Sequence, residues 1–188
     1  MKRTIAILLA ALLLLATSCT STDNTDKKGE KDVPSGSAIE FWAEDSPEGN
    51  LKKEKGTIDE SLTRTDAAKG SKMKVGETGK DAQKAITHYR VKQHYEGYDL
   101  VKIKLETGRM HQIRAHFASI GHPLLGDTRY GDFALNREAK KTLGLHRLFL
   151  HSCRLEFVWQ GERKVFDCPL PKELQSVINQ LKPIKMDR

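Results

Sequence analysis

Residues 105–131 read LETGRMHQIRAHFASIGHPLLGDTRYG, and the rest of the chain can be interpreted outward from this run. The pattern predicts, in order, the end of a strand, a turn at Gly108, a short helix and an abrupt stop. Gly121 suits the left-handed residue that ends a helix, and Pro123 prevents the helix from continuing. The run therefore predicts a strand–turn–helix unit.

The predicted helix carries one narrow apolar stripe, which indicates that this face packs against a core. The stripe consists of Met110, Ile113, Phe117 and Ile120. At about 100° per residue, Arg114 lies about 40° beyond the edge of the stripe, where a guanidinium can be half-buried and aimed. His116 is expected on the opposite flank.

Strands are predicted on the N-terminal side of this unit. Val101, Ile103 and Leu105 alternate with charged residues across 98–106, which is typical of a half-buried strand. Shorter strands are expected at 38–43, 73–75 and 87–91, with charged loops at 45–55 and 69–84.

On the C-terminal side we expect a surface helix at 134–142, a long strand at 147–159 and a return strand at 163–168. Gln160–Gly161 is a tight-turn signal, and a two-residue loop there pairs Arg154 with Asp167, Leu155 with Phe166 and Cys153 with Cys168.

An amphipathic helix follows Pro171. Its apolar positions are Leu174, Val177, Ile178 and Leu181. Together these elements predict an α+β fold, a mostly antiparallel mixed sheet with a few packed helices.

The composition points to a polyanionic partner, with solubility as the alternative explanation. The 188 residues carry a formal net charge of +7, and 30% of them are charged. Basic proteins bind nucleic acid by displacing its counterions. The histidines and cysteines show no zinc-type spacing, so no metal site is expected.

The first 37 residues form separate segments. Lys2 and Arg3 precede about twelve apolar residues, which span roughly 18 Å, too short for a hydrocarbon core of about 30 Å. Residues 1–19 therefore predict a signal peptide whose end resembles a bacterial lipobox, with lipidation expected at Cys19. Residues 20–37 are expected to be a disordered linker. The globular domain is predicted at 38–183, with a tail at 184–188.

The run Thr107-Gly-Arg-Met-His-Gln-Ile-Arg114 resembles motif III of the RluA-type RNA pseudouridine synthases. Three further segments match that family in order: 56–59 (GTID), 85–91 (AITHYRV) and 148–152 (LFLHS), the last followed by the hairpin and by CPLP at 168–171. The resemblance covers roughly 39–181 and corresponds to the C-terminal half of the family's catalytic domain. It is greatest to the branch that acts on large-subunit ribosomal RNA.

The resemblance implies an isomerase that converts uridine into pseudouridine, with uridines of 23S ribosomal RNA as the expected targets and with no cofactor and no metal. In the family an aspartate of an H-R-L-D-x-x-T-S-G stretch attacks the flipped nucleotide. Arg114 matches the arginine that orients this aspartate, and Phe41 matches a base-contacting tyrosine. Arg109, His111 and Arg129 are the implied RNA-binding residues.

Two departures from the family bear on activity. The H-R-L-D-x-x-T-S-G stretch does not occur in the sequence, and Phe41 lacks the hydroxyl of the family's tyrosine. Asp127 lies in a matching motif at a position that is structural in the family. The chain is therefore expected to be an incomplete copy of a synthase.

Three functions follow from these observations: a pseudouridine synthase, a catalytically silent RNA-binding remnant, or an envelope lipoprotein. RNA chemistry implies a cytoplasmic monomer bound to ribosomal RNA, whereas Cys19 implies membrane attachment. A fused or truncated reading frame would explain both signals.

Loss of half a domain would expose a sheet edge and an apolar face, so we expect marginal stability. Cys153 and Cys168 are expected to be buried thiols in the cytosol, or a disulfide after export.

Overall fold

The computed structural model describes residues 38–44, 50–65, 72–76 and 79–185. All of them belong to the second of two compact units, residues 32–188. The predicted signal peptide, the lipobox and the linker lie outside the described residues.

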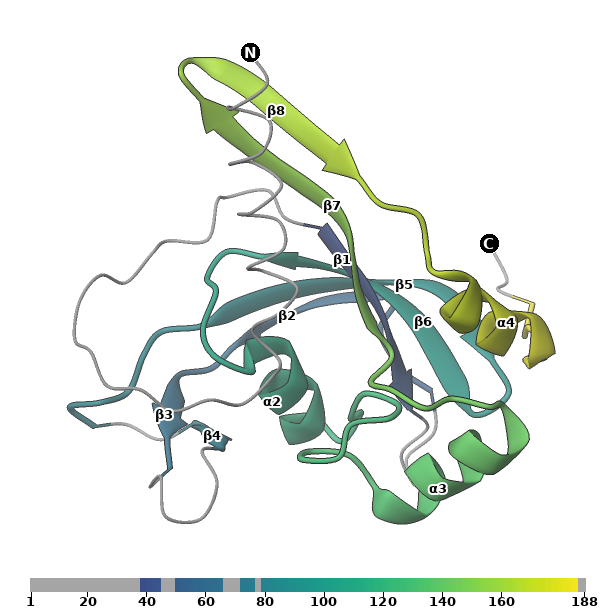
Figure 1. The fold of residues 1–188 in the computed structure, drawn as a ribbon. Helices are drawn as coiled ribbons and strands as arrows, with labels where there is room; N and C mark the ends of the chain where they lie inside the picture. Colours follow the sequence, from purple (N-terminus) through teal and green to yellow (C-terminus); the bar gives the residue numbers. More distant parts are fainter. Residues whose placement is uncertain (1–37, 45–49, 66–71, 77–78, 186–188) are drawn as a thin grey trace. The chain divides into compact units, whose positions relative to one another are not determined.

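A six-stranded sheet forms the framework of this unit (Figure 1). Its strands are β2 (Lys55–Asp59), β5 (Ile86–Tyr95), β6 (Tyr98–Leu105), β1 (Ala38–Glu44), β7 (Leu150–Trp159) and β8 (Glu162–Asp167), in that spatial order. The strand pairs β2–β5, β5–β6, β6–β1, β1–β7 and β7–β8 are all antiparallel. The prediction of an α+β fold is confirmed, while the expected mixed sheet is antiparallel throughout the described residues.

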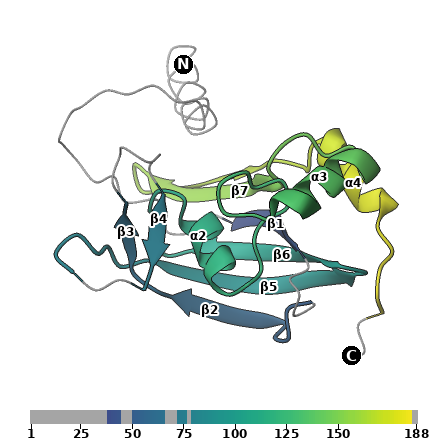
Figure 2. The same ribbon diagram turned by 90° about the horizontal axis from the view of Figure 1, so that it is seen from below.

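Three helices and a small hairpin complete the described part. The helices are α2 (Gln112–Ser119), α3 (Phe133–Thr142) and α4 (Lys172–Gln180), and the hairpin is β3 (Leu62–Arg64) with β4 (Met73–Val75). Figure 2 shows α2 over strands β5 and β6, beside the β3–β4 hairpin. The helix therefore packs against the large sheet through Ile113 and Phe117 and against the hairpin through Ala115.

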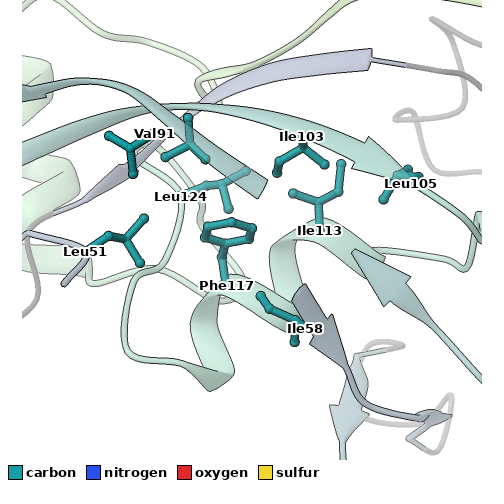
Figure 3. Packing of buried hydrophobic residues seen from close by; sticks show 9 residues of the cluster. Leu51, Ile58, Val91, Ile103, Leu105, Ile113, Phe117 and Leu124 are labelled. Atoms are coloured by element: carbon teal, nitrogen blue, oxygen red, sulfur yellow. The ribbon is translucent and has the colours of Figure 1, made fainter. Parts of the chain in front are cut away.

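The main hydrophobic core lies between the sheet and α2 (Figure 3). Its buried members are Leu51, Ile58, Val91, Val101, Ile103, Leu105, Ile113, Phe117 and Leu124. The inward positions of β5 and β6 alternate along each strand, as the period-2 pattern predicts. Ile113 and Phe117 bring the helix onto this surface, and Phe117 is fully buried.

A second cluster joins α3 and α4 to the strand ends. It consists of Tyr95, Leu125, Ala139, Leu145, Phe149, Leu174 and Val177. The predicted C-terminal helix and its apolar face are confirmed, since Leu174 and Val177 are buried. The backbone amide of Ile184 donates to the His94 carbonyl oxygen (2.9 Å), so the packed region reaches past the predicted boundary at residue 183.

The predicted β7–β8 register is confirmed, with Arg154 opposite Asp167 and Leu155 opposite Phe166. The Cys168 amide donates to the Cys153 carbonyl oxygen (2.7 Å), so these two residues also face each other. The expectation of buried thiols is wrong, because Cys168 is exposed and Cys153 only half-buried. Among the described residues, neither cysteine forms a disulfide. The hairpin extends past the other strands, and none of the described helices α2, α3 and α4 covers it (Figure 1).

One expectation about the central helix is wrong. Met110 precedes the helix and is exposed, because α2 begins only at Gln112. His116, expected on the flank away from the apolar stripe, is fully buried. Its ring nitrogens bond to the Thr87 hydroxyl (2.9 Å) and the Glu60 carbonyl oxygen (3.0 Å). Gly121, as expected, has a positive φ of 79°.

Candidate functional site

The turn that leads into α2 is held by Gln112, a buried side chain. Its Oε1 accepts from the Thr107 hydroxyl (2.8 Å) and the Arg109 backbone amide (2.9 Å). Its Nε2 donates to the Ile86 carbonyl oxygen and the Thr87 hydroxyl, both at 3.0 Å. Since Ile86 and Thr87 begin β5, Gln112 fixes the start of α2 to the sheet.

His111 precedes the helix in a left-handed backbone conformation, with φ 55° and ψ 17°. This conformation costs a non-glycine residue roughly 1–2 kcal/mol. The surrounding contacts hold it there: its Nδ1 lies 3.1 Å from the Tyr130 hydroxyl, and the two rings meet edge to face. Burial lowers the pKa of His111, and the positive charges of Arg114 and Arg129 lower it further. The ring is therefore neutral near pH 7.

Arg114 and Asp127 form the central ion pair of the site. Arg114 Nε donates to Asp127 Oδ2 (2.8 Å) and Arg114 Nη2 donates to Oδ1 (2.6 Å). The carboxylate is fully buried, whereas the arginine side chain is 14% exposed. Two parallel hydrogen bonds fix the plane of the guanidinium. Arg114 is thus half-buried and aimed, as its helical position predicts.

The carboxylate of Asp127 is ionised and accepts four hydrogen bonds. Burial raises the pKa of its carboxyl group, but hydrogen bonds from Arg114 and from the amides of Arg129 and Tyr130 outweigh burial and bring the pKa below its ordinary value. The two amides donate to Oδ1 at 2.8 and 3.0 Å. A buried carboxylate with four donors is an anchor for Arg114 and has no access to a substrate carbon.

Tyr130 forms the aromatic wall of the site. The Arg114 Cζ lies 5.3 Å from the centre of its ring, a cation–π distance. The Tyr130 hydroxyl accepts from the Met73 amide (2.7 Å), which connects the site to β4. Burial raises the pKa of this hydroxyl, so it stays protonated.

The loop that carries Asp127 is held by close backbone contacts. Asn136 Oδ1 accepts from the Gly126 amide (2.7 Å), and its Nδ2 donates to the Asp127 carbonyl oxygen (2.8 Å). Gly126 has φ +77°, and a Cβ on it would lie 2.3 Å from the Arg147 carbonyl oxygen. The loop therefore presents Asp127 to Arg114 as a preformed unit.

The other residues predicted for the site are distributed around this pair. Arg109 Nε donates to the Lys84 carbonyl oxygen (3.2 Å), which directs it along the segment before β5. Arg129 is exposed next to Asp127. Phe41 occupies the middle of β1, opposite Val101 and Leu150, and its side chain lies outside what the structure describes. Cys19 also lies outside the described residues.

Sequence reasoning missed three residues that build the site: Gln112, Tyr130 and Asn136. Tyr130 belongs to the same motif as Asp127, and this could have identified it as a site residue. Gln112 and Asn136 act through hydrogen bonds to distant backbone atoms, which no periodicity reveals.

Within the described ranges, no cluster of His, Cys, Asp and Glu side chains could hold a metal ion. Across the same residues, the helices are too short and too polar for any of them to span a bilayer. What the site offers chemically is a rigid guanidinium, one aromatic ring and a neutral imidazole. This set suits the positioning of an anionic group.

Comparisons with known proteins relate this geometry to a family. The family described as RNA pseudouridylate synthase matches residues 38–119. Ribosomal large subunit pseudouridine synthase D of Haemophilus influenzae is 38% identical over 138 residues, covering 68% of this chain and 40% of that protein. The Vibrio parahaemolyticus protein of the same name is 36% identical over 135 residues, with the same coverage. The chain thus spans about 40% of the length of these relatives.

Solved structures show the same fold. Human RNA Pseudouridylate Synthase Domain Containing 1 superposes with a TM-score of 0.66 at 23% identity, covering 81% of this chain and 61% of that one. Human RNA Pseudouridylate Synthase Domain Containing 4 gives 0.59 at 21% identity, with coverages of 80% and 64%.

Proposed function

Because the chain belongs, over residues 38–119, to the RNA pseudouridylate synthase family, we propose that it acts in the isomerisation of uridine to pseudouridine in 23S ribosomal RNA. The reaction breaks the glycosidic bond, rotates the uracil and joins its C5 to C1′ of the ribose. The observation that supports this proposal best is the Arg114–Asp127 pair. The pair fixes the guanidinium of Arg114, the residue whose place in the motif matches the family's aspartate-orienting arginine.

Arg114 is a positioning residue in this proposal. A guanidinium has five N–H donors, and two of them are bonded to Asp127. Part of the side chain reaches the surface, where it can orient a second carboxylate and keep it ionised. Asp127 itself is excluded as the nucleophile by its complete burial.

The nucleophile belongs, in this proposal, to a segment other than these 188 residues. The H-R-L-D-x-x-T-S-G stretch does not occur in the sequence, and the region around His146-Arg147-Leu148 continues with Phe149. Residues 38–183 then supply the arginine side of the site. The aspartate side then comes from a segment that contains the H-R-L-D-x-x-T-S-G stretch.

The remaining site residues contact RNA in this proposal. Phe41 offers a ring for stacking on the target base but no hydroxyl. Arg109, His111 and Arg129 surround the start of α2 and the Asp127 loop, where backbone phosphates of a flipped nucleotide would lie.

In this proposal the chain acts in the cytoplasm, as a monomer that binds ribosomal RNA. Lipidation at Cys19 would instead attach it to a membrane, away from ribosomes. Cell fractionation of the native chain and of a Cys19→Ser variant separates the two locations. Recovery of the native chain with membranes, and of the variant without them, would contradict the cytoplasmic assignment.

The function is tested with a 23S ribosomal RNA transcript and chemical mapping of pseudouridine. The full chain is expected to bind the transcript in a salt-dependent way and to form no pseudouridine alone. A chimera in which residues 38–183 replace the matched segment of the Haemophilus influenzae relative is expected to form it. Product from the chain alone would contradict the assignment of the nucleophile. A folded but inactive chimera would contradict the function.

A further inference from the structure

Tyr130 connects the loop, the helix and the small hairpin that meet at the Arg114 site. Its backbone amide donates to Asp127 Oδ1 (3.0 Å), and its ring centre lies 5.3 Å from Arg114 Cζ. The ring also packs against a small buried cluster, which consists of Leu62, Met73, Ala85 and Ala115. These contacts hold the ring in place, so its hydroxyl oxygen has a defined position.

The Tyr130 hydroxyl lies between a backbone donor and a ring nitrogen. Its oxygen accepts from the Met73 amide (2.7 Å) and lies 3.1 Å from His111 Nδ1. Among the described residues it has no other hydrogen-bond partner. A backbone amide can only donate, so the hydroxyl proton is left for Nδ1. Burial raises the pKa of the phenol, which therefore keeps this proton near pH 7.

This hydrogen bond selects one tautomer of His111. Burial and the charges of Arg114 and Arg129 lower the pKa of the ring, so it is neutral near pH 7. A neutral imidazole carries its proton on one nitrogen, and the hydrogen bond made by the other decides which. Since Nδ1 accepts from Tyr130, the proton is on Nε2. The two rings meet edge to face, with centres 5.7 Å apart, which holds the imidazole plane.

The Nε2 side of His111 is open to a ligand. The residue is half-buried, and Nε2 has no hydrogen-bond partner in the part of the chain that the structure describes. The buried polar atoms without a partner there are Thr63 Oγ1 and His122 Nδ1, so Nε2 of His111 reaches solvent. The charges of Arg114 and Arg129 outweigh that of Asp127 at this ring. A neutral donor in positive surroundings suits an anionic oxygen.

We propose that Tyr130 is a positioning residue that holds His111 as its Nε2–H tautomer, so that Nε2 donates a hydrogen bond to a phosphate oxygen of the RNA backbone. The inference rests on the proposed function for its ligand. It adds the donor atom, the neutral state of the donor and the residue that orients it. Because the donor is neutral, the contact adds a hydrogen bond without releasing a counterion.

The tautomer is measured by ¹⁵N NMR at pH 7 on the full chain, labelled with ¹⁵N-histidine and free of RNA. His111→Asn identifies the His111 signals among those of the seven histidines. The wild-type chain should show a protonated Nε2 and an unprotonated Nδ1. Tyr130→Phe keeps the ring but removes the hydroxyl, so both signals should move toward those of exchanging tautomers. Tyr89→Phe removes a hydroxyl from β5 and should change neither signal.

The contact with RNA is measured by fluorescence anisotropy with fluorescein-labelled octauridylate across a salt series. His111→Gln keeps an amide N–H at the same remove from Cβ as Nε2 and should bind as the wild-type chain does. His111→Asn carries its amide at the place of Nδ1 and should weaken binding about threefold or more. Asparagine adopts the left-handed conformation of residue 111 readily, so this loss does not come from backbone strain.

The salt dependence separates a neutral contact from a charged one. The slope of log K against log salt should stay unchanged in His111→Asn. It should fall by about 0.7 in Arg129→Gln, which removes a cation beside a single strand.

A proton on Nδ1 in the wild-type chain, or unchanged His111 signals in Tyr130→Phe, would overturn the role of Tyr130. Wild-type affinity in His111→Asn, or a reduced salt slope in that variant, would overturn the neutral contact with phosphate. Neither measurement uses catalysis, so a chimera that forms no pseudouridine would contradict the proposed function and leave these results standing.

Discussion

At the scale of single residues, the site depends on one buried charge and the groups that satisfy it. Asp127 accepts two hydrogen bonds from Arg114 and two from backbone amides. Removing one member of a buried ion pair leaves the other uncompensated, which is far more costly than removing a surface pair.

Asp127→Asn is expected to lower the free energy of unfolding by about 3–5 kcal/mol, because Arg114 would keep its charge without a counterion. Asp81→Asn removes an exposed carboxylate and serves as the control, with a change within about 0.5 kcal/mol. Urea denaturation at pH 7 measures both. Equal stability of the two variants would show that Asp127 does not anchor Arg114.

His116 is expected to make the stability depend on pH. Burial lowers the pKa of its ring below 6.5, so the unfolded state binds a proton more readily than the folded state. Its contribution is present above pH 6.5 and is lost as the pH falls through the folded-state pKa.

Urea denaturation at pH 7 and pH 5 measures this loss. His116→Gln should reduce the difference in unfolding free energy between the two pH values. His146→Gln, at an exposed position, should leave the difference unchanged. If His116→Gln shows the same difference in unfolding free energy between pH 7 and pH 5 as the wild-type chain, the loss of stability in acid comes from another residue.

At the scale of elements, the sequence predicted what local patterns determine. The alternation in β6, the turn at Gln160–Gly161 and the apolar face of α4 each follow from a period or a turn residue. His116 and Gln112 depend on contacts with residues 25 or more positions away along the chain, and Asn136 depends on the loop nine and ten residues before it. The half-buried position of Arg114 follows from helical spacing and was predictable. Its pairing with Asp127 depends on how the loop after the helix folds back, which helical spacing does not reveal.

Gly126→Ala tests whether the Asp127 loop is fixed by close backbone packing. Both Gly126 and Gly144 have positive φ, but a Cβ at Gly144 would meet nothing within 4 Å. Gly144→Ala should therefore cost only the conformational term, about 1–2 kcal/mol. Gly126→Ala should cost clearly more, because the Arg147 backbone must move. Equal losses in thermal or urea unfolding would contradict a preformed loop.

At the scale of the whole molecule, the β7–β8 hairpin combines apolar exposure with paired charges. Val158 is 70% exposed and Trp159 52%. Glu156 pairs with Arg154 and Arg163, and Arg154 also pairs with Asp167. The exposed apolar side chains make this hairpin prone to non-specific aggregation at high protein concentration, which is distinct from a defined oligomer.

Val158→Glu is expected to raise the concentration at which the chain remains soluble, because it places a carboxylate opposite Arg163. The unfolding free energy should change by less than about 0.5 kcal/mol. Ser176→Glu on α4 adds the same charge at an exposed site away from the hairpin. Light scattering compares the two, and equal solubility would show that the hairpin does not drive association.

The most direct test of the central claim is the rate of pseudouridine formation by the chimera that carries residues 38–183, with and without Arg114. The wild-type chimera should modify the 23S transcript. Arg114→Lys keeps a positive charge beside Asp127 but loses the two parallel hydrogen bonds, so it should reduce the rate at least tenfold while the fold, measured by circular dichroism, is retained. An Arg114→Lys chimera that modifies the transcript at the wild-type rate would contradict the claim that the arginine held by Asp127 orients the catalytic aspartate.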